Sequence, residues 1–310
     1  MLLLMRATVI LLLCLPPLIW SSLTVVGRAV VGDVPPISLT FWSMVAALLV
    51  LVPIGAAGVA REWSCVVREW RQLVVSAALG VAAFKSLYYL GIELTTAINA
   101  SILGPTLPIM IAGSARVVLG ERMSAVQLIG VVITVVGVLL TSAQGRLDLL
   151  LTMHLNAGDM LILAAFASMA VYTILLRKSP TRLSPWVFVT VIFALATVML
   201  IPFYVMELIA GTHRAIPWRH AIAILYIGIV TYIFGIVVWN LAVARLGATL
   251  PAMSVFLIPV FGTILATGFL GEVMRWYHYA GLIFTVLGVL LTVTQGQALR
   301  ASGAGNSGHG

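Results

Sequence analysis

The sequence is divided into ten apolar segments, and each is long enough to cross a lipid bilayer, which takes about 20 mostly apolar residues. Proline stands at several segment starts, as at Pro36 and Pro185, where a helix needs no N–H donor. The predicted spans are residues 7–26, 36–57, 73–92, 97–119, 124–142, 157–176, 184–206, 220–240, 248–270 and 276–294. No loop between them is long enough for a second, soluble domain. The pattern predicts a polytopic helical bundle.

Charged residues are too few to cover a water-facing surface. Only 8% of the 310 residues are charged and 62% are hydrophobic, whereas an ordinary soluble domain has roughly 25% charged residues. This composition excludes a soluble enzyme, a nucleic-acid-binding protein and a disordered chain. The formal net charge of +8 is typical of Lys and Arg retained in the cytoplasmic loops of a membrane protein. We therefore expect a lipid bilayer, and no nucleic acid, as the partner.

The cysteines and the N-terminal segment indicate neither a cofactor nor a cleaved leader. Cys14 lies in an apolar run and Cys65 in a charged loop, so they form neither a disulfide framework nor a metal site. No cluster of metal-ligating residues and no Gly-rich phosphate loop is found, and we expect no cofactor. The first 20 residues have the composition of a signal peptide, but no small-residue cleavage site follows them. We expect this segment to remain as a span.

The two halves of the chain repeat each other at a shift of 151 residues. The motif Gly120-Glu121-Arg122-Met123 falls on Gly271-Glu272-Val273-Met274, and Pro108 falls on Pro259. Gly130 and Gly137 fall on Gly281 and Gly288 in the same register. Agreement across two spans and the preceding turn indicates a tandem duplication of a five-span unit.

Five spans per unit is an odd number, so the second copy must begin on the opposite side of the membrane. We therefore predict an all-α membrane protein with ten transmembrane helices, arranged as two inverted five-helix repeats. The first repeat covers residues 7–142, the second covers 157–296, and residues 297–310 are a Gly/Ser-rich tail that we expect to be disordered. Inverted repeats are typical of secondary transporters, whose substrate site lies near the midplane between the halves.

The distribution of Lys and Arg predicts the orientation. With a cytoplasmic N-terminus, eleven basic residues fall on the cytoplasmic side and five on the other side. The eleven are Arg6, Arg61, Arg68, Arg71, Arg116, Arg122, Arg177, Lys178, Arg182, Arg245 and Arg300. This bias predicts a multi-pass protein of the plasma or inner membrane with both termini in the cytoplasm.

Lys85 is the one basic residue well inside a predicted span. A charge there costs at least about 2.5 kcal/mol unless it finds water or a partner, so it is a candidate functional residue. Tyr88 and Tyr89 follow at helical spacing and lie on the same side. A cavity lined by one ammonium and several aromatic rings would suit a partly apolar solute with a carboxylate. The alternative is that Lys85 snorkels to the outer end of its span.

The corresponding span of the second half carries Tyr232, Trp239 and Asn240. At the repeat shift, Trp239 aligns with Tyr88 and Asn240 with Tyr89. Aromatic side chains near span ends are often interface anchors, which is the alternative to a binding role. Asn240 should point into the bundle, because its amide needs partners. Trp20, in the first span, is a further candidate for the cavity wall.

Carboxylates, glycines and prolines recur at matched positions of the two repeats. Glu121 and Glu272 each follow a glycine that ends a span, where a carboxylate caps the N-terminus of the next helix or couples transport to protons. The repeated glycines form packing seams, either within the fold or at a homodimer contact. Prolines interrupt spans four and nine, which we expect to line the path or to hinge. They are Pro105, Pro108, Pro251 and Pro259.

These motifs resemble the EamA-type repeat of the drug/metabolite transporter superfamily. The first copy has Tyr88-Tyr89-Leu90, Ala97, Pro108, Gly120-Glu121, Gly130 and Gly137. The second has Trp239-Asn240-Leu241-Ala242, Gly247-Ala248, Pro259, Gly271-Glu272, Gly281 and Gly288. This second copy begins in a way that resembles its usual start in the family, with Asn156-Ala157-Gly158-Asp159 followed by Ala170-Val171-Tyr172. The resemblance covers about residues 7–296.

The resemblance implies a ten-helix carrier of small metabolites, often an exporter of amino acids, with a central cavity and no bound cofactor. One departure is that members often have an Arg early in the second span, where this chain has Phe41-Trp42-Ser43-Met44. We expect export of a small-molecule substrate, an amino acid or a related amphipathic solute, by alternating access. A lipid or lipid-linked-sugar flippase is the alternative within transport. A membrane-embedded enzyme would need a cluster of His, Asp or Cys within the spans, and the sequence has none.

Overall fold

The computed structural model describes residues 2–26, 33–146, 148, 154–210, 216, 218–271 and 273–306. The described residues form helices and turns, with no strand among them. Within these ranges, nine helical segments are long and apolar enough to cross a membrane, and a shorter apolar helix covers Ala7–Ser21. The fold is the all-α membrane protein that the sequence predicts.

The first repeat contains several spans that are built from consecutive helical pieces. In chain order its elements are α1 (Leu2–Ser21), α2 (Leu23–Val26), α3 (Pro36–Arg61), α4 (Trp63–Arg68), α5 (Trp70–Ser76), η2 (Ala77–Ala83), α6 (Phe84–Leu94), α7 (Ala97–Leu103), α8 (Thr106–Ser114), η3 (Ala115–Leu119) and α9 (Ala125–Ser142).

The second repeat follows the same order of long and interrupted spans. Its elements are α11 (Ala157–Lys178), α12 (Pro185–Ile209), η4 (Trp218–His220), α13 (Ala221–Tyr226), η5 (Ile227–Phe234), α14 (Gly235–Leu246), α15 (Thr249–Ser254), η6 (Val255–Leu257), α16 (Ile258–Leu270) and α17 (Trp276–Asn306).

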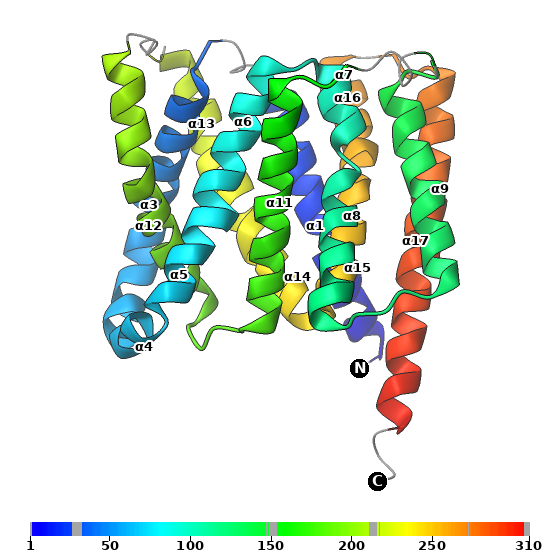
Figure 1. The fold of residues 1–310 in the computed structure, drawn as a ribbon, viewed down its shortest axis with the longest axis horizontal. Helices are drawn as coiled ribbons and strands as arrows, with labels where there is room; N and C mark the ends of the chain where they lie inside the picture. Colours follow the sequence, from blue (N-terminus) through cyan, green and yellow to red (C-terminus); the bar gives the residue numbers. More distant parts are fainter. Residues whose placement is uncertain are drawn as a thin grey trace.

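The two repeats run in opposite orientations (Figure 1). α1 rises from the lower end of the molecule, where both termini lie, and α9 ends at the upper end. α11 begins at that upper end and runs downward, and α17 returns the chain to the lower end. The second repeat therefore starts from the face opposite to the one at which the first starts, as an odd number of spans requires.

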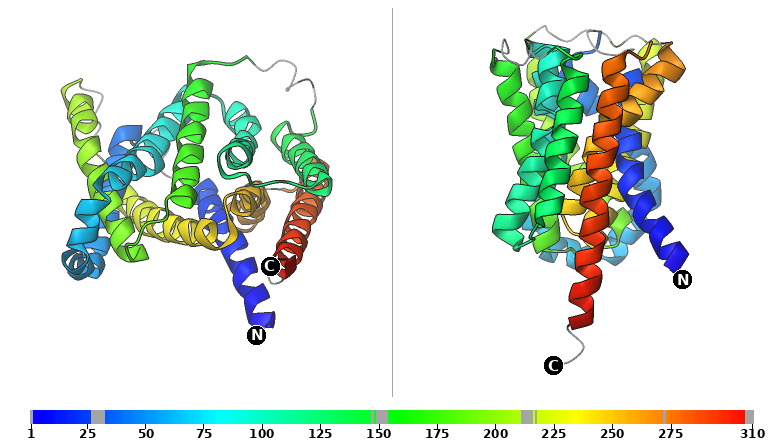
Figure 2. Two further views of the ribbon diagram at one scale, coloured as in Figure 1. Left: turned by 60° about the horizontal axis from the view of Figure 1, so that its bottom comes forward. Right: turned by 90° about the vertical axis from the view of Figure 1, so that its right-hand side faces the viewer.

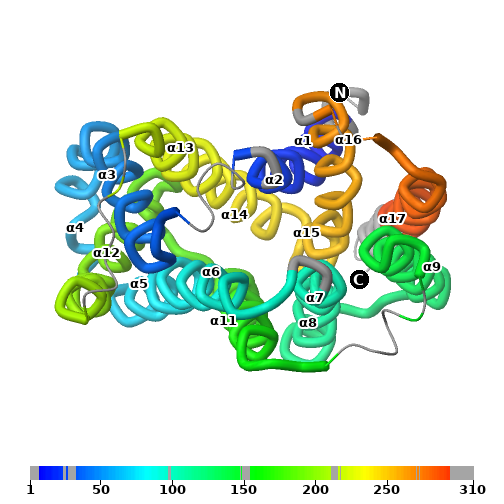
Figure 3. The backbone as a smooth tube through the Cα atoms, turned by 90° about the horizontal axis from the view of Figure 1, so that it is seen from above, coloured from blue at the N-terminus to red at the C-terminus, as the bar shows by residue number. Residues whose placement is uncertain are grey.

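Helices of one repeat pack mainly on helices of the other. α3 packs on α12, α8 on α15, and α9 on α17, so three spans lie against their own counterparts. α1 packs on α14 and α6 packs on α11, which are equivalent pairs related by the inversion. Figure 3, seen from above, shows the α3 and α12 pair at one end and the α9 and α17 pair at the other. Neither repeat is a separate bundle.

Local sequence signals explain where the helices begin. Pro36 and Pro185 occupy the first turns of α3 and α12, where the missing N–H costs no hydrogen bond. α9 begins with a capping box in which Ser124 and Gln127 bond each other's backbone N–H. Asn156 and Asp159 form the same motif at the start of α11.

The repeated Gly-Glu turn has a conformational cause. Gly120 ends η3 with a φ of 68°, and Gly271 ends α16 with a φ of 66°. Both values lie in the left-handed region that glycine enters without a steric penalty. Glu272, the carboxylate of the second turn, lies outside the described residues.

Spans four and nine are interrupted, as their prolines predict. The fourth span breaks between α7 and α8 at Gly104 and Pro105, and Pro108 lies buried in α8. The ninth span changes to a 3-10 turn, η6, and Pro259 stands in the first turn of the following α16.

The repeated glycines form a seam within the fold, which was the first of the two sequence-based alternatives. A Cβ on Gly130 would lie 2.7 Å from the carbonyl oxygen of Gly288, and one on Gly137 would lie 2.7 Å from that of Gly281. The backbones of α9 and α17 approach so closely because these positions carry no side chain.

The end of the chain differs from the sequence-based expectation. The structure continues α17 as helix to Asn306, whereas composition predicts a disordered tail from residue 297. The helix extends past the other elements at the lower end (Figure 2, right). Residues such as Gln297, Ala298 and Leu299 have good helix propensity and prolong a helix that has already formed.

Candidate functional site

Lys85 lies in the first turn of α6 and its side chain reaches across to the second repeat. Its Nζ is 3.4 Å from the ring centroid of Tyr232, in η5. Tyr232 is only 1% exposed. The ammonium therefore lies over an aromatic face inside the bundle, a favourable cation–π position, rather than at the end of its span as a snorkelling side chain would.

Tyr88 and Tyr89, one turn after Lys85 in α6, extend the aromatic group that begins with Phe84 and Tyr232. The ring of Tyr88 is 6.1 Å from that of Phe84, 6.1 Å from that of Tyr89 and 6.0 Å from that of Phe166 in α11. The Tyr89 hydroxyl lies near that of Tyr232. Tyr88 and Tyr89 are half-buried. The structure thus brings Lys85, Tyr88, Tyr89 and Tyr232 together.

Trp239 and Trp20 form a second aromatic group. Their ring centroids are 5.4 Å apart, which joins α14 to α1. Trp239 is 1% exposed, so it is part of the packed interior and not an interface anchor. Gly235, one turn earlier, leaves room for the indole of Trp20, because a Cβ there would lie 2.5 Å from Trp20 Nε1.

Asn240 points into the bundle, as its polarity predicts. Its Oδ1 accepts a 2.7 Å hydrogen bond from the hydroxyl of Tyr172, in α11. From the sequence, Tyr172 was recognised only as part of a motif that resembles the family's, and not as a residue of the site. Its tyrosine hydroxyl in an otherwise apolar span was the available signal, because a buried hydroxyl needs a partner.

Several buried polar atoms near these groups have no hydrogen-bond partner among the described residues. They include Ser43 Oγ, Ser86 Oγ, Trp239 Nε1 and Asn240 Nδ2. An unpaired buried donor costs roughly 1–3 kcal/mol, and such atoms in a native structure call for an explanation. All four can donate a hydrogen bond, so the interior presents donors to a group that accepts.

The aromatic group around Lys85 and the pair of Trp20 and Trp239 both adjoin π-helical stretches, which lie at matched places in the two repeats. A shift of 151 places η2 (Ala77–Ala83) on residues 228–234 of η5. Lys85 follows η2 closely, and Tyr232 lies within η5. π-helical turns widen the helix locally and are frequent at functional sites.

Glycines allow the π-helical stretches to pack closely. A Cβ on Gly80 would lie 2.5 Å from the ring of Tyr172, and one on Gly228 would collide with the carbonyl oxygen of Ser43. These contacts hold η2 against α11 and η5 against α3. They fix the positions from which Lys85 and Tyr232 project.

Glu121 is a helix cap, but for a helix other than the next one. Its carboxylate accepts hydrogen bonds from the N–H of Ala248 at 3.1 Å and from the N–H and hydroxyl of Thr249 at 3.0 and 2.5 Å. These groups begin α15 of the other repeat, where the helix dipole favours a negative charge. The expectation that Glu121 caps the following helix, α9, was wrong, because Ser124 already serves there.

The repeats also meet at the lower end of the molecule. Glu69 accepts hydrogen bonds from the Thr181 hydroxyl at 2.5 Å and from the Arg182 N–H at 3.2 Å. We call this the lower contact. Burial by itself would raise the pKa of the Glu69 carboxyl, but these hydrogen bonds outweigh burial and lower the pKa.

A matching contact lies at the upper end. The Asp33 carboxylate is 3.1 Å from the Arg219 guanidinium and 3.1 Å from His220 Nε2. We call this the upper contact. The hydrogen bond from Arg219 holds the pKa of the Asp33 carboxyl below its usual range. Spans of the two repeats are thus tied to each other at both faces.

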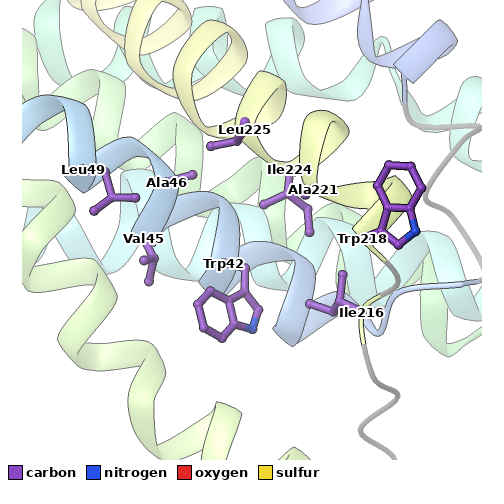
Figure 4. A pocket seen from close by; sticks show the side chains of 9 residues that line it. All are labelled: Trp42, Val45, Ala46, Leu49, Ile216, Trp218, Ala221, Ile224 and Leu225. Carbon is purple, nitrogen blue, oxygen red and sulfur yellow. The ribbon is translucent and has the colours of Figure 1, made fainter.

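A groove on the flank of the molecule is a separate feature (Figure 4). It has a volume of about 340 Å³ and lies between α3 and the region around α13. Its walls include Trp42, Val45 and Leu49 of α3 together with Trp218, Ile224 and Leu225, and all its lining side chains are apolar. None of the sequence-predicted site residues lines it.

Comparison with known proteins identifies relatives over the whole span region. The profile of the EamA-like transporter family matches residues 7–143 and again 156–294. A protein of Archaeoglobus fulgidus named as an uncharacterized transporter is 32% identical, and the match covers 92% of this chain and 97% of that protein. A Streptantibioticus cattleyicolor protein named as a probable terminal-alkyne amino-acid exporter is 26% identical over 80% of each chain.

A solved crystal structure has the same fold. It superposes with a TM-score of 0.76 and 19% sequence identity, covering 94% of this chain and 99% of its own. This likeness concerns the architecture alone.

Proposed function

This chain belongs to the EamA-like transporter family, and we propose that it is a secondary carrier that exports amino acids or related amphipathic metabolites by alternating access. The inverted repeats support this, because such repeats surround a substrate site near the midplane. The relatives are named as transporters, and one is named as a probable amino-acid exporter. Transport rather than catalysis is the function that these names support.

The observation that carries the proposal is the ammonium of Lys85 over the ring of Tyr232. A cation held inside the bundle, without a carboxylate partner among the described residues, can bind the carboxylate of a solute. The faces of Tyr88 and Tyr89 would hold the apolar part of the same solute. The unpaired donors Trp239 Nε1 and Asn240 Nδ2 could donate hydrogen bonds to its remaining carbonyl or carboxylate oxygens.

Alternating access would use the contacts at the two ends. Opening the path to one face requires separation of the spans that meet there, so the upper contact and the lower contact would break in turn. Their hydrogen bonds are few and half-exposed, and breaking one set at a time keeps the cost small.

The orientation follows from the positive-inside rule. The lower end, where both termini lie (Figure 1), is the side to which sequence counting assigns eleven of the basic residues. We propose that this end faces the cytoplasm and that the protein lies in the plasma or inner membrane.

The decisive experiment is counterflow uptake into proteoliposomes, with labelled amino acids, nucleosides and sugars as the panel. Lys85→Ala should reduce uptake of a carboxylated solute about 10- to 100-fold, because a hydrogen bond to a charged group contributes roughly 1.5–3 kcal/mol. Lys178→Ala is the matched control, since Lys178 is the other lysine of the chain and is exposed at the end of α11. Equal uptake by wild type and Lys85→Ala would contradict the role of Lys85.

A lipid flippase is the second candidate function, and the flank groove of Figure 4 is the observation that favours it. A flippase needs a lateral opening to the bilayer, and this groove is open and apolar. Apart from the indole N–H groups of Trp42 and Trp218, its lining offers a headgroup no polar side chain and no charge, which favours the carrier. Folded wild-type protein that moves none of the panel solutes but scrambles fluorescent lipids would reverse this preference.

A further inference from the structure

The elbow between the second and third spans has an unusual distribution of charge. It comprises the end of α3, the short helix α4 and the start of α5, at the lower end of the molecule (Figure 1). Arg61, Arg68 and Arg71 are all exposed in it. Among the residues that the structure describes, none of these three forms an ion pair. Three free cations therefore lie at the membrane boundary.

The two carboxylates of the elbow do not neutralise these arginines. The Glu62 carboxylate accepts a 2.9 Å hydrogen bond from the N–H of Ser184. The Glu69 carboxylate forms the lower contact with Thr181 and Arg182. Both acids are thus directed to the turn before α12, in the other repeat. The outer surface of the elbow is left with positive charge only.

Large apolar side chains are exposed between the arginines. Trp63 is 59% exposed, Val67 is 52% exposed and Trp70 is 54% exposed. The guanidinium of Arg71 lies 5.5 Å from the ring centroid of Trp70. Tryptophan is enriched at the level of lipid headgroups, where its ring is partly in the apolar phase and its N–H meets water. The elbow therefore combines an apolar anchor with cations at the depth of the headgroups.

The equivalent position on the opposite face is built differently. At the repeat shift of 151, Arg68 corresponds to Arg219. Arg219 is paired with Asp33 at 3.1 Å in the upper contact. Arg219 is thus neutralised by an ion pair, whereas Arg68 forms no ion pair with a described residue. At this one matched position, therefore, the two faces of the molecule differ in whether the arginine is paired.

From this charge complementarity we propose that the lower elbow binds the headgroup of an anionic phospholipid. The guanidinium groups of Arg61, Arg68 and Arg71 donate to its phosphate oxygens, a match of planar donors to an oxyanion, and Trp63 and Trp70 contact the adjoining acyl region. Glu62 and Glu69 of the same elbow bond the turn before α12. A lipid bound at the elbow would therefore bear on how the lower end opens.

The test is native mass spectrometry of the delipidated full chain, titrated with phosphatidylglycerol or phosphatidylcholine. The variant R61Q/R68Q/R71Q should bind phosphatidylglycerol at least tenfold more weakly than wild type, with binding of phosphatidylcholine unchanged. R177Q/R245Q, which removes two basic side chains near the same face but outside the elbow, should bind phosphatidylglycerol within twofold of wild type. Equal binding by the triple variant, or an equal loss in R177Q/R245Q, would overturn the proposal.

Two further measurements distinguish a lipid bound at the elbow from a free anion and from a lipid bound at another place. Inorganic phosphate at the same concentrations should not compete with phosphatidylglycerol, and full competition would indicate a free-anion site instead. Phosphatidylglycerol with brominated acyl chains should quench the tryptophan fluorescence of wild type more than that of W63F. Equal quenching in both would show that the lipid binds elsewhere. Melting temperatures of all variants check that each is folded.

Discussion

The third and eighth spans occupy the same place in the two repeats, but they present their side chains differently. At a shift of 151 residues Lys85 corresponds to Ile236, which is 4% exposed, and Tyr88 to Trp239, which is 1% exposed. Lys85 and Tyr88 themselves are half-buried. Both spans retain the π-helical stretch. Both copies thus have the backbone irregularity, while at these two positions the third span has half-buried polar side chains and the eighth span has packed ones.

The contacts at which these spans begin differ in the sign of their charges. Glu69, at the start of the third span, meets Thr181 and Arg182. Its counterpart at the repeat shift is His220, at the start of the eighth span, which with Arg219 meets Asp33. At the lower end an acid on the span accepts from a hydroxyl and a backbone N–H of the facing turn, and at the upper end basic side chains on the span meet an acid. The equivalent span ends thus carry opposite charges and use different partners to meet the other repeat.

The largest expected effect comes from truncating the packed member of the pair. Trp239→Ala should lower the free energy of unfolding by about 3–5 kcal/mol, because it leaves a cavity against Trp20. Tyr88→Ala should cost clearly less, since its side chain keeps part of its surface exposed. Melting temperatures in detergent compare the two variants. Equal losses would show that both spans are packed alike and would remove the contrast.

An intermediate effect should follow from filling the π-helical stretch of the eighth span. Gly228→Ala would push a Cβ against the backbone carbonyl of Ser43, and overpacking of this kind costs about 1–3 kcal/mol. Gly113→Ala is the control, because its Cβ would meet no atom within 4 Å. Thermal unfolding of the two variants measures the difference. A Gly228→Ala protein as stable as the control would mean that η5 does not need its close approach to α3.

The smallest effect concerns the upper contact and depends on pH. Arg219 lowers the pKa of Asp33 in the folded protein, so the carboxylate adds stability above its unfolded pKa of about 3.9. That contribution is lost as the pH falls through the lowered folded pKa. Wild type should therefore melt slightly higher than Asp33→Asn at pH 7, with the gap closing in acid and at high salt. A gap that persists in strong acid, below the lowered folded pKa where the carboxyl is protonated in both states, would exclude the ion pair as its cause.

The course of the spans could be predicted from sequence because it depends on local signals. Hydropathy predicts a span over residues 124–142, and α9 runs over Ala125–Ser142. The left-handed Gly120 and Gly271 and the breaks of spans four and nine follow from glycine and proline chemistry. The inverted arrangement follows from the sequence repeat together with the odd number of spans in each copy.

The contacts between repeats could not be predicted in the same way. Nothing in the sequence says that Lys85 faces Tyr232, or that Glu121 caps α15 and not α9, because these partners lie in spans brought together only by tertiary packing. The π-helical stretches have no composition that distinguishes them from α-helix. Lys85, Tyr232 and Asn240 were candidates because they are polar or aromatic within apolar spans, and their partner Tyr172 emerged only in three dimensions.

The glycine seam between α9 and α17 has a consequence for how the chain is made. The two helices occupy equivalent places 151 residues apart in the sequence. At a synthesis rate of about 5–20 residues per second, α9 enters the bilayer roughly 8–30 seconds before its partner exists. During that interval its small-residue face has only lipid, or a chaperone, to contact. The rate of translation therefore sets how long α9 remains in the bilayer without its partner helix α17.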